Sequence, residues 1–447
     1  MERIKRQVSP AQIILLGFAG TILLGALALM LPFATRDGHG ASFLDALFTA
    51  TSATCVTGLV VQDTWLYWTA FGQAVILALI QIGGMGVITV MVAVQIFSGR
   101  KIGLKQRWVM QESISGPQLS GILRHTRFIL RAVLCIEGIG AALLAIRFCP
   151  RYGLGKGLWF SVFHAVSAFC NAGFDLMGEQ GPFSSLTGYV GDGLVVFTIT
   201  GLIVVGGLGF YTWGDIRTHG LRLRAYSLQS KLILTMTAIL LGGGFLFFYC
   251  FEFSGSQWAE LSGTERVLAA WFQAVTPRTA GFNTVDLGML SQPGVAVTIL
   301  LMLIGGAPGS TAGGFKVTTL AVLTLGIGAI FRRREHPRCY GRRIPTDTER
   351  SAAAIFLLYI FLFLGGGMVL CLAGGADMQA ALLEASSAVG TVGLSLGLTP
   401  GLSDVCHCVL IFLMYLGRVG GLTMIYAVTA GAKPEVAQLP QERVTVG

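Results

Sequence analysis

Leu47-Phe-Thr-Ala-Thr-Ser-Ala-Thr-Cys-Val-Thr-Gly58 is the stretch that decides the fold, because the same pattern returns three more times along the 447-residue chain. The related segments run from Val162 to Gly173, from Trp271 to Gly281 and from Leu382 to Gly393, and the third is one residue shorter. Their terminal glycines lie 115, 108 and 112 residues apart. A single period that recurs over the whole length predicts four tandem repeats. We place them at residues 1–110, 111–224, 225–343 and 344–447.

Each repeat has the same order of parts. A long apolar run comes first, the short segment follows, and a second apolar run ends the repeat. The short segment has about a dozen residues, too few to cross a bilayer, and it carries Ser, Thr, His, Gln or Glu. It is typical of a re-entrant half-helix that ends in an extended loop buried among other helices. We therefore predict an all-α membrane protein with four (membrane helix, pore helix, filter loop, membrane helix) repeats around a pseudo-fourfold pore, with eight spanning helices.

The composition agrees with a membrane protein. Hydrophobic residues make up 53% of the chain, charged residues only 12%, and the mean hydropathy is +0.72, whereas a soluble domain carries about 25% charged residues. The first apolar run, from Ile13 to Leu31, leads to no cleavage site and to further apolar runs, so we expect a membrane helix there and not a signal peptide. A net charge of +9 would suggest nucleic acid for a soluble protein, but we expect no nucleic-acid partner here.

The placement of charge predicts an orientation. If the re-entrant loops open outward, 23 of the 31 basic residues lie on the cytoplasmic side, in agreement with the positive-inside rule. The segments on the outer side then hold 13 acidic residues, Glu252 and Glu384 among them, and six basic ones: Arg36, Arg147, Arg151, Lys156, Arg266 and Arg278. Both termini are predicted to be cytoplasmic, in a multi-pass protein of the bacterial cytoplasmic (inner) membrane. The negative outer side would attract cations.

The short segments end in four triplets that we interpret as an ion filter. A dehydrated K⁺ needs oxygen atoms in place of its water shell, and backbone carbonyls supply them when four extended loops face one axis; glycine permits the backbone angles involved. An alternative for any single loop is a glycine that only ends a half-helix. The predicted K⁺-binding triplets are Val56-Thr57-Gly58, Asn171-Ala172-Gly173, Thr279-Ala280-Gly281 and Thr391-Val392-Gly393.

The second apolar run of the third repeat predicts an interrupted helix. From Gly294 to Ile330 it has 37 residues, roughly 55 Å as a continuous helix and too long for one straight span. Five glycines and one proline in its middle disfavour helix, and backbone freed there must face protein or a wet cavity. Close packing of glycines is the alternative. The interrupted stretch is predicted to comprise Gly305, Gly306, Ala307, Pro308, Gly309, Ser310, Thr311, Ala312, Gly313, Gly314 and Lys316.

Other polar residues within apolar runs have simpler interpretations. Arg418 has apolar sequence on both sides, so we expect it to face a cavity, with snorkelling as the alternative. We expect Glu137 to form a hydrogen bond between two helices. Three glycine pairs in the second apolar runs are interpreted as sites of close helix packing: Gly83-Gly84, Gly206-Gly207 and Gly420-Gly421. The Cys406-His407-Cys408 stretch has no second ligand pair at zinc spacing, so no metal site is predicted there.

The repeated segments resemble the Ktr/Trk/HKT superfamily of K⁺ transporters over essentially the whole chain. The resemblance lies in Thr51 to Leu59, Asn171 to Phe174, Thr276 to Phe282 and Gly390 to Leu394, and it is strongest to the KtrB type of membrane subunit. It implies a homodimer with a cytoplasmic KtrA-like ring of regulatory subunits, which would carry the nucleotide. It also implies that the interrupted stretch, residues 305–314 with Lys316, is an intramembrane gating loop, with Arg418 beside it as part of the gate. Some members depend on Na⁺, so Na⁺ coupling is left open; glycine at position 58 fits K⁺.

Two other classes of function were considered. A secondary transporter of another small cation or solute would be expected to have inverted repeats, whereas the charges here give each repeat the same sidedness. An enzyme is not predicted, since the sequence has no His-Glu-x-x-His, Gly-x-Ser-x-Gly or paired intramembrane aspartates.

Overall fold

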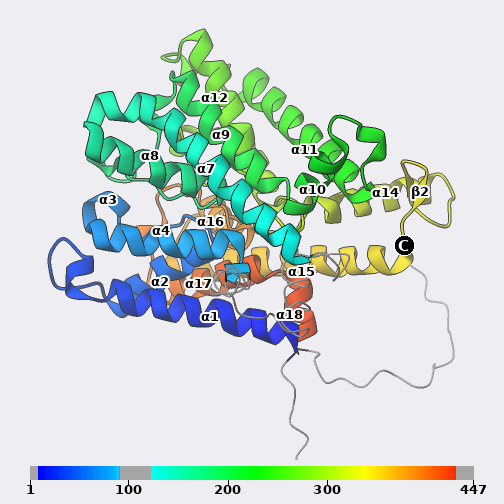
Figure 1. Cartoon of the computed structure of the whole chain (residues 1–447), viewed down its shortest axis with the longest axis horizontal. Coiled ribbons are helices and arrows are strands. Elements are labelled where there is room, and N and C mark those ends of the chain that lie inside the picture. Colours follow the sequence, from blue (N-terminus) through cyan, green and yellow to red (C-terminus); the bar gives the residue numbers. More distant parts are fainter. Residues whose placement is uncertain (1–8, 88, 91–121, 429–447) are drawn as a thin grey trace, which may run out of the picture.

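The computed structural model of the chain describes residues 9–87, 89–90 and 122–428, and these are almost entirely helical. Figure 1 shows the helices gathered around a central region where the chain leaves helical structure. Three expectations from the sequence lie outside the described residues. They are the boundary between the first two repeats at residues 110 and 111, the basic stretch from Arg100 to Arg107, and the position of both termini.

Four long helices begin the four repeats. They are α1 (Pro10–Leu29), α7 (Ile122–Tyr152), α11 (Leu228–Phe247) and α15 (Thr346–Gly374). By length and composition, each holds a stretch apolar enough to cross a membrane. The first helix begins at a capping box, in which Ser9 accepts from the Gln12 amide and the Gln12 side chain accepts from the Ser9 amide.

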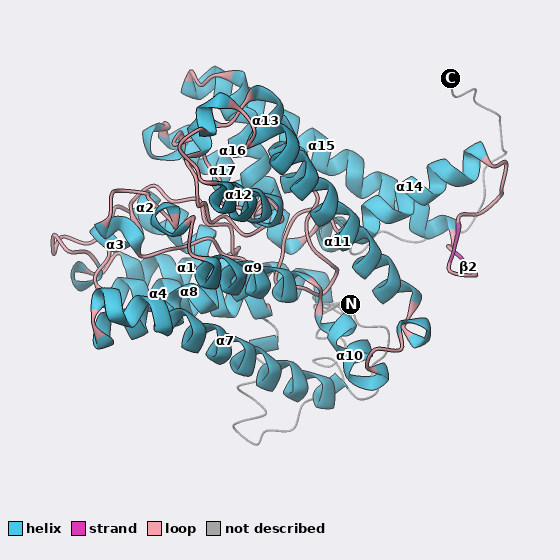
Figure 2. Cartoon of the chain, turned by 90° about the horizontal axis from the view of Figure 1, so that it is seen from above, coloured by secondary structure: helices cyan, strands magenta, loops and turns pink. Residues whose placement is uncertain are grey.

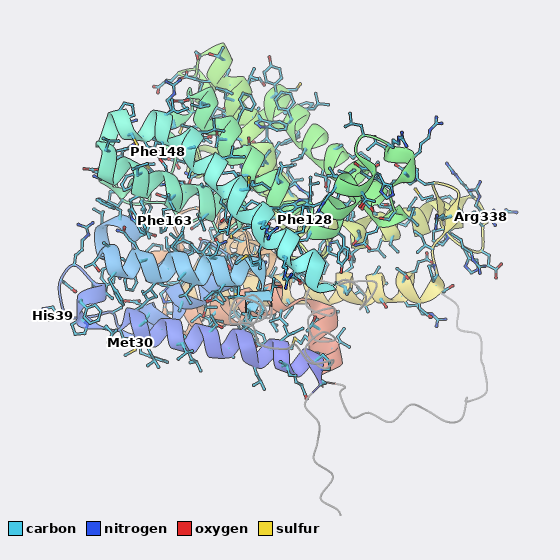
Figure 3. The ribbon with its side chains drawn as sticks, viewed as in Figure 1. Met30, His39, Phe128, Phe148, Phe163 and Arg338 are labelled. Carbon is cyan, nitrogen blue, oxygen red and sulfur yellow. The ribbon has the colours of Figure 1, made fainter. Side chains whose placement is uncertain are left out.

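A shorter helix follows each long one and packs against it. These helices are α2 (Phe43–Thr54), α8 (Leu154–Phe169), α12 (Gly263–Val275) and α16 (Met378–Gly390). Figure 3 shows Phe148 and Phe163 where α7 and α8 meet, and both side chains are fully buried. All four short helices end at the start of a predicted filter triplet or just before it, so their carbonyl ends, which carry partial negative charge, point toward the predicted ion path.

The second membrane segment of each repeat is interrupted or ends at a glycine. Gly86, Gly209 and Gly420 follow α4 (Ala70–Met85), α9 (Gly193–Gly207) and α17 (Asp404–Val419) with φ of +82°, +84° and +88°. After the break the chain continues as α10 (Phe210–His219) at 94° to α9, and as α18 (Gly421–Val428). Of the eight expected spans, therefore, only the four first helices are long single spans in the described part of the chain, or five spans if the bent pair α9–α10 is counted as one.

In the third repeat the break is much longer. Helix α13 (Gln292–Leu303) and helix α14 (Val317–Phe331) are separated by residues 304–316, which we call the inner loop. Beyond α14, the antiparallel strands β1 (Arg338–Cys339) and β2 (Arg342–Arg343) form a small hairpin at the edge of the molecule (Figures 1 and 2). The remaining short elements are α3 (Thr64–Tyr67), η1 (Pro32–Ala34), η2 (Met177–Glu179), η3 (Thr187–Tyr189), η4 (Leu223–Ala225), η5 (Phe248–Glu252), η6 (Ser256–Trp258), η7 (Leu287–Met289) and η8 (Thr399–Gly401).

Glycines let the second helices approach the short helices closely. A methyl group placed on Gly83 would lie 1.9 Å from the Thr54 carbonyl oxygen, and one on Gly206 would lie 2.1 Å from that of Phe169. The expected packing role of these two positions therefore agrees with the structure. In the fourth repeat Gly417 makes the same contact, because a methyl group there would lie 2.2 Å from the Val389 carbonyl oxygen. The expectation for Gly420 was wrong, because it forms the break; nothing lies within 4 Å of a methyl group there.

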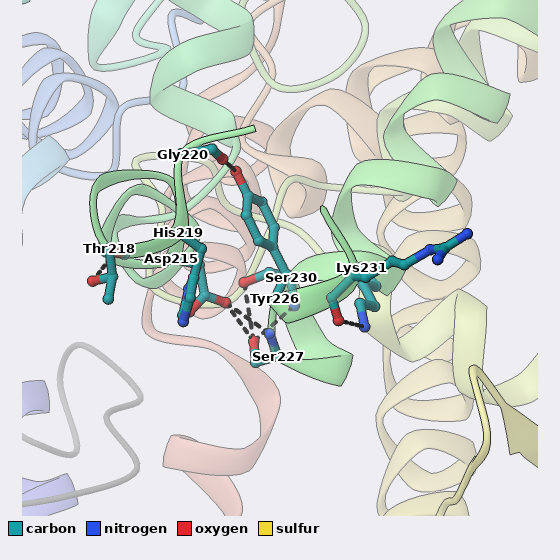
Figure 4. Close-up of polar contacts among 10 residues, drawn as sticks. Asp215, Thr218, His219, Gly220, Tyr226, Ser227, Ser230 and Lys231 are labelled. Carbon is teal, nitrogen blue, oxygen red and sulfur yellow. Dashed lines mark hydrogen bonds and ion pairs between the residues drawn. The ribbon is translucent and has the colours of Figure 1, made fainter. Parts of the chain in front are cut away.

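The connection between the second and third repeats is held by one carboxylate (Figure 4). Asp215 on α10 accepts hydrogen bonds from the Ser227 amide (3.1 Å) and the Ser227 hydroxyl (2.7 Å) at the start of α11. The Tyr226 hydroxyl also donates to the Gly220 carbonyl (2.5 Å). These contacts fix α10, which begins directly after the Gly209 break, against α11.

Candidate ion pathway

The four triplets share one unusual backbone conformation. The first residue of each is left-handed although it is not glycine, with φ of +50° at Val56, +59° at Asn171, +69° at Thr279 and +51° at Thr391. The terminal glycines have φ of +93°, +69°, +84° and +96°, in the same order. Left-handed non-glycine residues are uncommon, and strained backbone gathers at functional sites. Its occurrence at one position in all four repeats ties the sequence period to a common geometry.

A hydroxyl group from each short helix holds its own loop in place. The Ser52 and Ser387 hydroxyls accept from the amides of Gly58 (3.1 Å) and Gly393 (2.9 Å). In the other two repeats the hydroxyls of Ser167 and Thr276 donate to the carbonyls of Phe174 (2.7 Å) and Phe282 (2.5 Å). The serines and threonines of the repeated segment thus set the shape of the loops.

The four terminal glycines form a closed ring, which we call the glycine ring. A methyl group on Gly58 would lie 2.6 Å from the Ala172 carbonyl oxygen, and one on Gly173 would lie 2.7 Å from that of Ala280. In the same way, a methyl group on Gly281 would lie 2.3 Å from the Val392 carbonyl oxygen. One on Gly393 would lie 2.3 Å from the Thr57 carbonyl oxygen, which closes the ring. Each glycine therefore faces the carbonyl that precedes the glycine of the next repeat. The last two residues of each triplet therefore meet in one ring, and no side chain would fit at its glycines.

One side of the ring opens into a cavity of about 430 Å³, which we call the outer vestibule after the side on which the predicted topology places it. All four ring glycines line it, together with Asp63, Asp175 and Asp286. Burial, together with the nearby Asp63 carboxylate, raises the pKa of Asp175 to about 7, although a hydrogen bond from the Met177 amide opposes the shift. A concave site with three carboxylates concentrates cations before the ring.

A second cavity of about 270 Å³, the inner cavity, is lined by the helix breaks. Gly86, Gly420 and Phe210, which follows Gly209, all contribute to its wall, and so does the inner loop. Lys316 and Arg418 are its basic lining residues. The two cavities thus differ in the charge of their walls: acidic side chains line the outer vestibule, and basic side chains line the inner cavity.

The inner loop is held by the break in α9 and lies against the fourth triplet. The Ala307 amide donates to the Gly207 carbonyl (2.9 Å), and the Phe210 amide donates to the Gly309 carbonyl (2.9 Å). A methyl group on Gly313 would lie 1.9 Å from the Thr391 hydroxyl oxygen. The loop therefore contacts the fourth triplet and lines the inner cavity.

Three basic side chains bind carbonyls of this loop. Arg418 donates to the Thr311 carbonyl and to the Gly83 and Gly84 carbonyls, the last at 3.2 Å, so it joins three repeats. Lys316 donates to the Ala312 carbonyl (2.7 Å). Arg278 donates to the Gly305 carbonyl (3.1 Å) and is only 6% exposed.

Arg278 was predicted to be one of the outer basic residues, and this was wrong, because its side chain is buried against the inner loop. Its role as a partner of the loop was missed because the contact is 27 residues away in sequence. The only available signal was an arginine inside an otherwise uncharged triplet segment.

The family model for "TrkH: Cation transport protein" matches residues 16–434. The chain belongs to the TrkH family of cation transport proteins. It is 39% identical to the potassium/sodium uptake protein NtpJ of Enterococcus hirae, over 100% of this chain and 99% of that protein. It is 40% identical to the Ktr system potassium uptake protein B of Bacillus subtilis, over 94% of this chain and 93% of that protein. These likenesses confirm the resemblance to Ktr and Trk proteins.

The fold of this TrkH-family chain also resembles a solved structure. The potassium transporter TrkH from Vibrio parahaemolyticus superimposes with a TM-score of 0.73, over 97% of this chain and 87% of that one, at 20% identity. At that identity the likeness supports the fold alone. It agrees with an all-helical membrane architecture.

Two further sequence interpretations concern side chains near the pathway of this TrkH-family chain. Glu137 on α7 accepts from the Gln81 amide group on α4 (3.3 Å), as expected for a hydrogen bond between helices. His407 lies 2.9 Å from the Thr399 carbonyl through Nε2. Within the described ranges, no group of three His, Cys, Asp or Glu residues could hold a metal ion.

Proposed function

We propose that this protein takes up K⁺ across the bacterial cytoplasmic membrane through a channel-like path at the glycine ring. The observation that carries the proposal is the closed ring of four equivalent loops between the acidic outer vestibule and the inner cavity. Carbonyls of the four triplets would replace the water shell of K⁺. The names of relatives, which include potassium uptake proteins, support K⁺ as the transported ion.

The second candidate is a secondary transporter of another small cation or solute. The relative named a potassium/sodium uptake protein favours a role for Na⁺, as a second substrate or as a coupling ion. The uncharged ring, where backbone atoms of neighbouring loops leave no room for a side chain, favours an inorganic cation over an organic one.

Uptake by the purified protein in lipid vesicles tests this function. With radioactive Rb⁺ as the tracer for K⁺, uptake is expected to be blocked by excess K⁺ and not by equal concentrations of Na⁺ or of an organic amine. Uptake that requires Na⁺ outside would add coupling to the proposal. Equal competition by the organic amine would support the second candidate instead.

We further infer that the inner loop gates the path together with Arg418. It contacts the fourth triplet and lines the inner cavity, and its carbonyls hold three cationic side chains. A cation moving inward would meet this positive, narrow region after the ring. Displacement of the loop, with the cations it carries, would open the path.

Deletion of Ala307 to Gly313 is expected to raise Rb⁺ flux several-fold and to make it independent of any cytoplasmic partner. The deleted residues carry the contact with Thr391 and the carbonyl that Arg418 binds. Flux in vesicles and thermal unfolding in detergent would be measured on the same preparation. Basal flux from a folded variant would identify the loop as a packing feature.

The proposed partners follow from the family resemblance. We infer a homodimer and a cytoplasmic KtrA-like ring that binds the nucleotide, docked on the basic side of the membrane subunit. Arg332, Arg333 and Arg334, just after α14, are exposed and belong to that side. Basic loops also contact anionic lipid. Cross-linking from these positions to the ring is expected, whereas cross-linking only from the outer loops would reverse the topology, in which both termini are cytoplasmic.

The vestibule predicts a pH dependence that Asp175→Asn removes. The pKa of Asp175 is raised to about 7, so its carboxylate is charged above that pH and neutral below it. The Rb⁺ concentration for half-maximal uptake is therefore expected to rise, about threefold, as the outside pH falls from about 8 to 6. The variant should show the low-pH value at all pH values. Glu260→Gln, a change at an exposed residue outside the vestibule lining, serves as the control; retained pH dependence in Asp175→Asn would contradict the prediction.

A further inference from the structure

Each short helix carries a buried polar side chain at the aligned position, eight or nine residues before its ring glycine. The residues are Thr49, His164, Gln273 and Glu384, which precede their ring glycines by nine, nine, eight and nine positions. All four are at most 1% exposed. Only the fourth of them is a carboxylic acid. The four repeats are therefore alike in backbone and different in charge at this position.

Glu384 binds the outer part of its own loop through two hydroxyl groups. The Ser395 hydroxyl donates to one carboxylate oxygen, and the Thr399 hydroxyl donates to the other at 2.9 Å. Ser395 in turn accepts from the Gly397 amide (2.9 Å), so its proton is free for Glu384. Each carboxylate oxygen thus has one hydroxyl group placed to donate to it, an arrangement that an ionised carboxylate can accept in full.

No basic side chain balances this charge among the ion pairs of the described residues. A buried carboxylate without a counter-charge is costly. Both of its hydroxyl partners, Ser395 and Thr399, line the outer vestibule beside Gly393. The nearest place for a compensating positive charge is thus the cavity through which the transported ion would enter.

We propose that Glu384 provides the fixed negative charge that holds the permeant cation at the outer end of the glycine ring, and that it positions residues 394–399. This inference rests on the proposed function. It gives the fourth repeat a role of its own, because the equivalent residue of the second repeat holds its loop without charge: His164 accepts from the Leu176 amide (3.3 Å) through Nε2. Bracing of the loop and supply of charge are therefore separable.

The test compares Glu384→Gln and Glu384→Asp with Glu252→Gln as the matched control. Glu252 is another buried carboxylate, 1% exposed, that accepts from Trp258 (3.2 Å) and from the Ser291 amide (3.0 Å) and lines neither cavity. For each variant, the half-saturating Rb⁺ concentration and the maximal uptake rate would be measured in vesicles, and thermal unfolding would be measured in detergent. We expect Glu384→Gln to raise the half-saturating concentration roughly tenfold, the order expected for one nearby charge, with a smaller change in maximal rate.

The other variants decide between charge and bracing. Glu384→Asp keeps the charge and is expected to stay within about threefold of the wild type, while Glu252→Gln should lower thermal stability only. Equal changes in the Asp and Gln variants would assign Glu384 to bracing and overturn the proposal, as would an unchanged half-saturating concentration in Glu384→Gln.

If Glu384→Gln does not fold, Ser395→Ala removes one donor and leaves the Thr399 hydroxyl to stabilise the charged carboxylate. A half-saturating concentration close to that of the wild type supports the proposal, and a tenfold rise overturns it. Failure of the proposed function would look different, because the wild-type protein itself would then take up no Rb⁺.

Discussion

Replacing Gly58 by serine is expected to reduce the preference for Rb⁺ over Na⁺ by at least about tenfold, which corresponds to about 1.4 kcal/mol. The backbone at Gly58 has φ of +93°, which side chains disfavour. A β-carbon there would lie 2.6 Å from the Ala172 carbonyl oxygen and 3.1 Å from the Gly173 α-carbon. Both neighbours are backbone atoms of the next repeat, so the ring must shift to accept the new atoms.

The shift has a direction. Moving the Ala172 carbonyl away from the axis removes an oxygen from the set that would surround K⁺, and a smaller, more strongly hydrated Na⁺ loses less from that change. Rb⁺ uptake in vesicles competed by Na⁺ measures the effect. Gly242→Ser is the control, because nothing lies within 4 Å of a β-carbon at that helical position. If Na⁺ competes no better in Gly58→Ser than in the control, the assignment of the filter to these loops is wrong.

Replacing Arg418 by alanine is expected to raise the basal Rb⁺ leak by about tenfold or more. A guanidinium stays charged at any physiological pH, and in a narrow passage of low dielectric it repels a cation more strongly than in water. Arg418 also binds the Thr311 carbonyl of the inner loop and the Gly83 and Gly84 carbonyls at the end of α4. Its removal therefore takes away both the repulsion and the link between loop and helix.

Two measurements separate the roles of Arg418. Arg418→Lys keeps the charge and loses the forked donor, so it should leak less than Arg418→Ala but more than the wild type. Selectivity should be unchanged in both, because the glycine ring is intact. The competing explanation is an arginine that only braces the last helix, at a contact between two copies of the chain. Lower flux together with dissociated dimers in Arg418→Ala would favour that explanation over a barrier.

The repeated segments allowed much of this arrangement to be predicted from the sequence. The recurrence of the glycines every 108 to 115 residues identified the equivalent positions. Equivalence around an axis requires that Gly58 and Gly281 meet their neighbours in the same way. The break near Pro308 was predictable because proline and five glycines oppose a helix locally. These predictions depend only on nearby sequence.

The parts that were missed depend on distant contacts. Gly420 lies in the same kind of apolar sequence as Gly206, and a glycine in such a run indicates close packing or a break equally well. Only the neighbouring helices decide between the two. In the same way, the sequence placed Arg278 among the charges of the outer loops, because its buried partner Gly305 belongs to another segment.

Ion density along the axis of the glycine ring tests the central claim most directly. A structure of the protein determined in Rb⁺ or Tl⁺, with the ion located by its anomalous scattering, would show whether the ring holds a cation. We predict a peak on the axis, surrounded by the carbonyl oxygens of Thr57, Ala172, Ala280 and Val392, that disappears when Na⁺ replaces the ion. A saturated crystal with no peak at the ring, or with the ion bound only elsewhere in the protein, would contradict the account.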